Sequence, residues 1–171
     1  SIPIDKKNSN GKKLNEIKIF NQNKDHKDFW QRKHWESIKL NYKKSNFFEY
    51  FKEDLEKMYV DIKWESLVDI CWHQFIFFKK CLEINCRVVR MSEMKFEGKK
   101  DDLVLDHCLK LKGRAVVFGE KGKDYVNMNK FDKHNIKVYF QKYNHPEYKQ
   151  RFSGFFSNLS VIDLLLNHGP D

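Results

Sequence analysis

The chain has 171 residues, of which 40% are hydrophobic and 15% aromatic, a composition typical of folded domains rather than disordered chains. No run approaches the roughly 18 apolar residues that a membrane-spanning helix needs, and no signal peptide is recognisable. We therefore expect a cytoplasmic protein without a membrane span, in which residues 1–171 form a single domain.

The formal net charge of +9 raises the question of an anionic partner. Of the 33 basic residues only five are arginine, the residue that specific readers of bases and phosphates favour. The lysines alternate with acidic residues, which favours a solvated surface. We expect no nucleic acid partner, although a polyanion-binding module remains the alternative, supported by mixed lysine and aromatic residues over 137–151.

Cysteine and histidine spacings argue against a metal centre. The four cysteines form no C-x-x-C pair, and no two histidines are spaced four apart beside a carboxylate pattern. Cys71 and Cys108 fall on apolar helix patterns, which predicts reduced, buried thiols. We expect no metal site.

The N-terminal quarter carries two strand patterns and one helix pattern. Residues 2–4 and 14–20 are expected strands, joined by a polar loop that contains Asn-Ser-Asn-Gly at 8–11. Over residues 28–43 large side chains recur every four positions, which predicts a helix. The opening residues already have an apolar strand pattern and no Met precedes them, so we expect a piece of a longer protein.

Two helices follow in the central part. Ser45 is a candidate N-cap for the first, whose predicted apolar face is Phe48, Phe51, Leu55, Met58 and Tyr59. The second spans 64–82, and its predicted apolar face is Trp64, Leu67, Val68, Cys71, Trp72, Phe75, Ile76 and Leu82.

The second half of the chain alternates strand and helix patterns. The expected strands are 87–91, 115–118 and 136–140, and the expected helices are 101–112, ended by Gly113, and 160–166, with a helical turn at 122–128. The run at 115–118 is apolar throughout, as in a sheet covered on both faces. This order predicts an α/β fold: a partly parallel sheet flanked by helices in three layers, incomplete at the N-terminal side.

Polar residues follow each of the three expected strands. In open α/β sheets, ligands bind beyond the carboxyl ends of the strands, so we expect these residues to share one pocket. They are Ser92 and Glu93 after the first strand, Gly119, Lys121, Gly122, Asp124 and Tyr125 after the second, and Gln141, Tyr143, His145, Tyr148 and Gln150 after the third.

Several of these features have two interpretations. The backbone of 119–122 either wraps an anion or forms a tight turn that needs positive φ. His145 precedes Pro146 and is therefore expected in a loop, where it acts as a proton acceptor or only fixes the loop. Ser160 and Asp163 fit a capping box at a helix start.

Several stretches resemble the WbqC-like protein family. His145-Pro146-Glu147-Tyr148-Lys149-Gln150 is similar to the family's H-P-x-Y-x-Q motif, and 158–170 to its L-S-I-I-D-L-L-F-N run followed by E-G-P. Upstream, Lys33-His34-Trp35 resembles its H-W helix, Ser92-Glu93 its serine after a strand, and 119–125 its glycine-rich segment. The resemblance covers nearly the whole chain.

Some positions depart from this signature. Val117-Phe118 replace a serine-bearing strand end, Ser157 stands where proline is usual, and Leu166 and His168 replace phenylalanine and glutamate. The Q-P-x-Y-x-P-like and R-N-R segments that open the family are absent. We therefore expect an N-terminally truncated member, and an inactive remnant remains an alternative.

The resemblance implies an acyl or aminoacyl (glycine-type) transferase acting on amino sugars of bacterial cell-surface polysaccharides such as O-antigen. Its substrates would be an activated acyl donor, with no other cofactor, and a nucleotide sugar or other phosphorylated small molecule. The implied catalytic residues are His145 as proton acceptor, with Gln141 and Ser92 holding the acyl oxygen. Donor-binding residues are Gly119, Lys121, Gly122 and Tyr125; substrate-binding residues are Glu93, Asp124, Tyr143, Tyr148 and Gln150.

Overall fold

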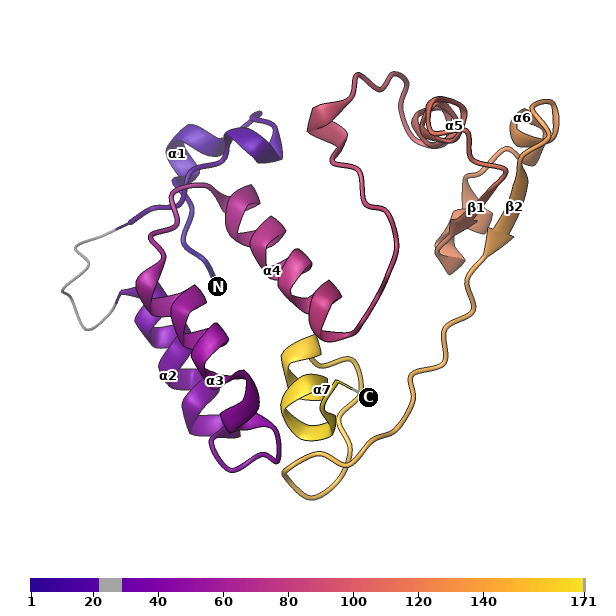
Figure 1. The fold of residues 1–171 in the computed structure, drawn as a ribbon. Helices are drawn as coiled ribbons and strands as arrows, with labels where there is room; N and C mark the ends of the chain where they lie inside the picture. The colour runs from indigo at the N-terminus through magenta and orange to yellow at the C-terminus, as the bar shows by residue number, and fades with distance from the viewer. Residues whose placement is uncertain (22–28, 171) are drawn as a thin grey trace. The chain divides into compact units, whose positions relative to one another are not determined.

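The computed structural model describes residues 1–21 and 29–170, which group into two compact units. Unit 1 comprises residues 1–85 and 146–171, and unit 2 comprises residues 86–145 (Figure 1). The single domain expected for residues 1–171 stays a prediction.

Unit 1 is built from helices. They are α1 (Lys6–Ser9), the 3₁₀ turn η1 (Leu14–Glu16), α2 (Trp30–Tyr42), α3 (Phe48–Glu56), the π-helix η2 (Lys57–Asp61), α4 (Leu67–Cys81) and α7 (Val161–His168). Helix α2 confirms the helix predicted over 28–43, whose first residue lies outside the described part of the chain. The expected N-terminal strands are reduced to single antiparallel bridges, Ile4 with Ile19 and Lys18 with Ser66.

The core of unit 1 confirms the apolar face predicted for the helix after Ser45. All five of its residues are buried, with exposed fractions of 6% or less, and they lie on α3 and its continuation η2. Gln31 of α2 stabilises this continuation, because its amide donates to the carbonyls of Ile62 (2.7 Å) and Tyr59 (3.1 Å). A π-helix leaves backbone carbonyls displaced from regular helix geometry, and the buried amide supplies donors for two of them.

The structure confirms the predicted apolar face of α4 only in part: Trp64 is buried, and Leu67 and Leu82 pack against the core. Ile70, which the prediction leaves out, is fully buried, whereas Phe75 and Ile76 are 45% and 42% exposed. Cys71 is exposed too, so its expected burial is wrong. Nine of the twelve residues at 67–78 are apolar, so the spacing does not single out one face.

Unit 2 contains a parallel two-stranded sheet. Strand β1 (Ala115–Phe118) pairs with β2 (Lys137–Phe140), and Ala115 lies opposite Lys137. The chain passes between them through η4 (Glu120–Asp124) and α6 (Met128–Asp132), while η3 (Met91–Glu93) and α5 (Asp101–Lys110) precede them. The mixture of helices with a parallel sheet confirms the α/β class.

Two expectations for this sheet are wrong. Residues 87–90 form no strand and Met91 begins η3, because no neighbouring strand in the described residues offers them a hydrogen-bonding partner. Val117 is 65% exposed, so the sheet is not covered on both faces as the apolar run at 115–118 suggested. The buried core of unit 2 is small and consists of Cys108, Phe118, Phe131 and Ile136.

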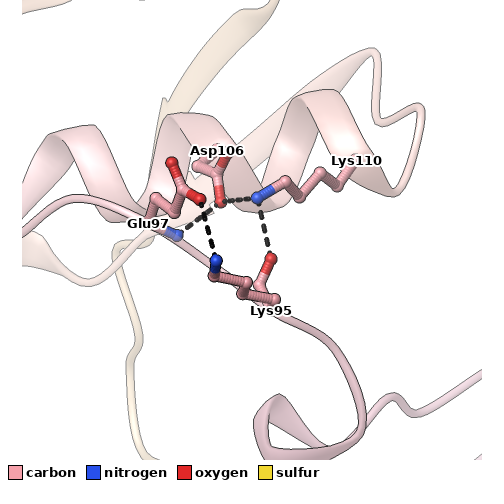
Figure 2. A network of polar contacts seen from close by, with 4 residues as sticks. All are labelled: Lys95, Glu97, Asp106 and Lys110. Atoms are coloured by element: carbon pink, nitrogen blue, oxygen red, sulfur yellow. Dashed lines mark hydrogen bonds and ion pairs between the residues drawn. The ribbon is translucent and has the colours of Figure 1, made fainter.

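A polar network attaches the segment before α5 to that helix (Figure 2). The Asp106 carboxylate accepts the backbone N–H of Glu97 (2.8 Å) and the Lys110 ammonium (2.9 Å). Lys110 also donates to the carbonyl of Lys95 (2.7 Å). These contacts lower the pKa of Asp106, first through the Glu97 hydrogen bond and then through Lys110.

None of the helices in residues 1–21 and 29–170 has the length and apolar character needed to cross a bilayer.

Candidate functional site

The candidate site lies at the carboxyl edge of the parallel strands in unit 2. The backbone N–H of Gln141 donates to the carbonyl of Phe118 at 2.8 Å. This bond continues the ladder by one step, so the residues that leave β2 run beside those that leave β1. The segment from Gln141 and the turn from Gly119 therefore start next to each other, as the strand-end argument predicts.

Close packing explains why a glycine occupies position 122 in the turn after β1. A Cβ on Gly122 would lie 2.6 Å from Cβ of Phe118 and 3.2 Å from the Phe140 ring, so only glycine fits there. Neither Gly119 nor Gly122 has positive φ, so the interpretation as a positive-φ turn is wrong. The N–H of Gly122 donates to the carbonyl of Gly119 (2.8 Å), which removes that donor from any anion-binding role.

The side chains of this turn are open to solvent. Lys121, Lys123 and Asp124 are exposed, and a Cβ at Gly119 would meet nothing within 4 Å. Tyr125 is 53% exposed and packs edge-to-face on Phe118, with ring centroids 6.3 Å apart. Glu120 is exposed as well, so the turn offers two ammonium groups, two carboxylates and a phenol to solvent.

The segment after β2 carries the imidazole. Residues 141–145 have no regular secondary structure, in agreement with the loop expected before Pro146. His145 is half-buried and meets Tyr143 edge-to-face at 5.8 Å between ring centroids. Tyr143 itself is 63% exposed, so this pair presents a ring edge to solvent.

Ser92 and Glu93 do not follow a strand, contrary to the prediction. Both belong to η3, both are exposed, and no strand precedes them. The rule that places ligands beyond the ends of strands therefore no longer applies to these two residues.

Tyr148 and Gln150 belong to unit 1, where they contact a buried carboxylate. Asp163, 4% exposed, accepts hydrogen bonds from the Tyr148 hydroxyl (2.7 Å) and the Gln150 amide (3.0 Å) through Oδ2. Its Oδ1 accepts from the Tyr42 hydroxyl (2.9 Å) and the Asn167 amide (3.1 Å). We call Tyr42, Tyr148, Gln150, Asp163 and Asn167 the Asp163 network.

The Asp163 network corrects two predicted caps. Ser160 does cap α7, because its hydroxyl accepts from the N–H of Ile162, but the Asp163 side chain reaches the network and not the N-cap. Ser45 caps no helix, since its hydroxyl donates to Oδ1 of Asn167 at 3.2 Å. Burial, followed by the bond to Asp163, raises the pKa of Tyr42 far above its ordinary value, so this phenol remains a donor.

Of the twelve predicted site residues, ten belong to unit 2 and two to unit 1. The structure brings together the turn at 119–125 and the segment starting at Gln141, and it holds Tyr148 and Gln150 on Asp163. Sequence reasoning missed Tyr42, Asp163 and Asn167 as partners. For Asp163 and Asn167 the signal in the sequence was an acid and an amide four residues apart, and for Tyr42 there was none. In the described residues no three His, Cys, Asp or Glu side chains gather as a metal site.

Comparison with known proteins identifies the family. The sequence model of the WbqC-like protein family matches residues 1–171. The chain belongs to the WbqC-like protein family. The two motifs that carry the resemblance, 145–150 and 158–170, are therefore those of a WbqC-like protein, and the Asp163 network joins them in unit 1.

A curated relative of this WbqC-like protein comes from Mycobacterium tuberculosis. The uncharacterized protein Rv1507c is 24% identical over 143 residues, which cover 83% of this chain and 62% of the relative. The chain thus spans less than two thirds of the length of the relative it matches. No solved structure matches it significantly.

Proposed function

We propose that this WbqC-like protein transfers an acyl or aminoacyl group from an activated donor to the amine of a sugar in bacterial cell-surface polysaccharide synthesis. The observation that supports the proposal is the bond from Gln141 to Phe118, because the segment that leads to His145 starts next to the start of the lysine-bearing turn. An imidazole together with the two lysines of the turn would suit proton transfer next to an anionic substrate.

The transfer balances without a further reactant. The sugar amine attacks the acyl carbonyl, a C–N bond forms, and the bond from the acyl carbon to its leaving group breaks. His145 takes the proton that the nitrogen loses and returns it to the leaving group. An imidazole suits both steps because it can accept a proton at one stage and donate it at the next.

The neighbouring side chains have distinct roles in this proposal. The ammonium groups of Lys121 and Lys123 neutralise the phosphates of a nucleotide sugar or of the donor. The Gln141 amide donates to the developing oxyanion of the acyl group. Tyr125 and Tyr143 supply exposed aromatic surface for the substrate. Ser92 and Glu93 are not assigned a role, since they do not follow a strand.

Replacement of His145 by Ala tests this proposal. The full-length protein is incubated with nucleotide amino sugars and a panel of activated acyl and aminoacyl donors, and the products are measured by mass spectrometry. We expect a sugar whose mass has grown by the acyl group less one hydrogen, and a loss of at least about 100-fold in rate for His145→Ala.

The matched control is His134→Ala, which removes an exposed histidine between α6 and β2 in the same unit. Its rate should equal that of the wild-type protein. Equal rates for the two variants would remove His145 from the chemistry. The absence of product with every donor would remove the proposed transfer itself.

A further inference from the structure

Unit 1 contains a cleft that the proposed chemistry does not use. It has a volume of about 900 Å³, which is in the range of small-molecule sites. One wall comes from α3 and η2, with Tyr50, Asp54 and Lys57, and the other from one face of α4. Along α4 the lining residues Asp69, Trp72, His73, Ile76, Phe77 and Lys80 recur at spacings of three and four.

Large apolar side chains are partly exposed on both walls of the cleft. Ile76 is 42% exposed, whereas Ile70 on the same helix is fully buried. Trp72 is half-buried, and Tyr50 on the opposite wall is 72% exposed. Large side chains that stay partly open on both walls of one hollow are typical of a ligand site.

The base of the cleft is held in place before any ligand binds. The indole N–H of Trp64 donates to the carbonyl of Met58 at 2.8 Å, and the indole packs on the His73 ring at 5.1 Å between centroids. Met58 is the second residue of the π-helix η2, and single turns of π-helix are frequent at functional sites. Such a preformed wall loses little entropy on binding.

The charge of the lining selects among ligands. The cleft is lined by three carboxylates, Asp54, Asp69 and Glu83, and by two ammonium groups, Lys57 and Lys80, so its formal charge is negative in a chain of net charge +9. Asp54 acts across the cleft: burial first, and then this carboxylate, raises the pKa of the Cys81 thiol. A phosphorylated ligand is disfavoured here, and a cationic one is favoured.

We infer that this cleft binds the sugar ring of an amino sugar with its amine protonated. The ring's C–H faces pack on Trp72, Phe77 or Tyr50, because the negative face of an aromatic ring attracts the slightly positive C–H groups. Asp54 and Asp69 pair with the ammonium group and accept from hydroxyls. The inference goes beyond the proposed function: the cleft belongs to unit 1 and holds a free amino sugar as an ammonium ion, whereas the transfer in unit 2 needs an unprotonated amine as its nucleophile.

Binding measured by protein-observed NMR tests the inference. The full chain is titrated with glucosamine, N-acetylglucosamine and glucose near neutral pH. Glucosamine should bind at least about tenfold more tightly than the two uncharged sugars, and should shift amide signals on α3 and α4. Equal affinity for all three sugars, or no binding, would overturn the inference.

Three variants separate the possible results. The double variant Asp54→Asn, Asp69→Asn should lose the tenfold preference, while Asp61→Asn, an exposed carboxylate of η2 that does not line the cleft, should keep it. An unchanged preference in the double variant would overturn the inference. His145→Ala should bind glucosamine like the wild-type protein, so a failure of transfer alone leaves the binding result intact.

Discussion

Two polar regions of this WbqC-like protein, the Asp163 network of unit 1 and the turn after β1 in unit 2, differ in burial. In unit 1, Asp163 is 4% exposed and accepts hydrogen bonds from four side chains. In unit 2, the turn after β1 leaves Lys121 and Asp124 exposed to solvent. A buried, fully hydrogen-bonded carboxylate contributes mainly to stability, whereas exposed groups are available to a ligand.

The hydrophobic cores of the two units differ in size. Among the described residues, twelve buried hydrophobic side chains form the core of unit 1, and four form that of unit 2. The smaller core leaves unit 2 more dependent on each close contact, such as that of Gly122. The longest motif of the family, at 158–170, therefore marks a structural feature in unit 1, and the chemistry proposed for unit 2 depends on shorter segments.

The largest effect is expected at Asp163. In Asp163→Asn one carboxylate oxygen becomes an NH₂ group, which then faces donors whichever way the amide is turned. Buried donors without an acceptor are costly, so the free energy of unfolding should fall by about 3 kcal/mol in urea denaturation. Tyr42→Phe, which removes one donor, should cost about 1.5 kcal/mol.

The control is Glu147→Gln, an exposed carboxylate next to Tyr148. It should change the free energy of unfolding by less than about 0.5 kcal/mol. If Asp163→Asn were no more destabilising than this control, unit 1 would not depend on the Asp163 network, and the contrast between the units would fail.

A smaller effect is expected at Gly122 in unit 2. In Gly122→Ala the new methyl group lies 2.6 Å from Cβ of Phe118, so the turn or strand β1 must move. Overpacking of this kind costs about 2 kcal/mol. Hydrogen exchange at the amides of β1 and β2 should report faster opening of unit 2.

Gly119→Ala is the matched control, because its φ of −63° suits alanine and its Cβ meets nothing within 4 Å. It should be neutral or stabilise by up to about 1 kcal/mol through the unfolded chain. Similar exchange rates for the two variants would mean that the close approach at Gly122 does not support the sheet.

Local structure is predicted most reliably from the sequence where a pattern of residues is compatible with only one arrangement. The spacing from Phe48 to Tyr59 leaves a single apolar face, and that face is buried. The predicted parallel pair at 115–118 and 136–140 forms, since both segments are short, apolar and joined by a short crossover. Ser160 caps α7 because an N-cap depends only on its own next residues.

The remaining features depend on contacts distant in sequence. The face that α4 buries is decided by its neighbours, because apolar residues occur on several of its sides. Residues 87–91 have strand character but lack a partner strand in the described structure. Tyr42 and Tyr148 lie 121 and 15 residues from Asp163 in the sequence, so no local spacing predicts the Asp163 network.

The smallest effect is a pH dependence confined to unit 2. The pKa of Asp106 lies below its ordinary value because the Glu97 N–H and Lys110 both favour the carboxylate. The unfolded chain therefore takes up a proton first as the pH falls. The stability that the Asp106 contacts contribute is complete above about pH 4 and disappears as the pH drops through the lowered folded pKa.

An NMR titration of the Glu97 amide should show this loss below about pH 4, as the segment at 95–97 detaches from α5. Asp106→Asn should remove the titration, and Asp132→Asn, an exposed carboxylate on α6, should leave it unchanged. A Glu97 amide that titrates equally in both variants would show that another group holds the segment. Because the Asp106 contacts are partly exposed, their loss should leave β1 and β2 paired, in contrast to the effect of Gly122→Ala.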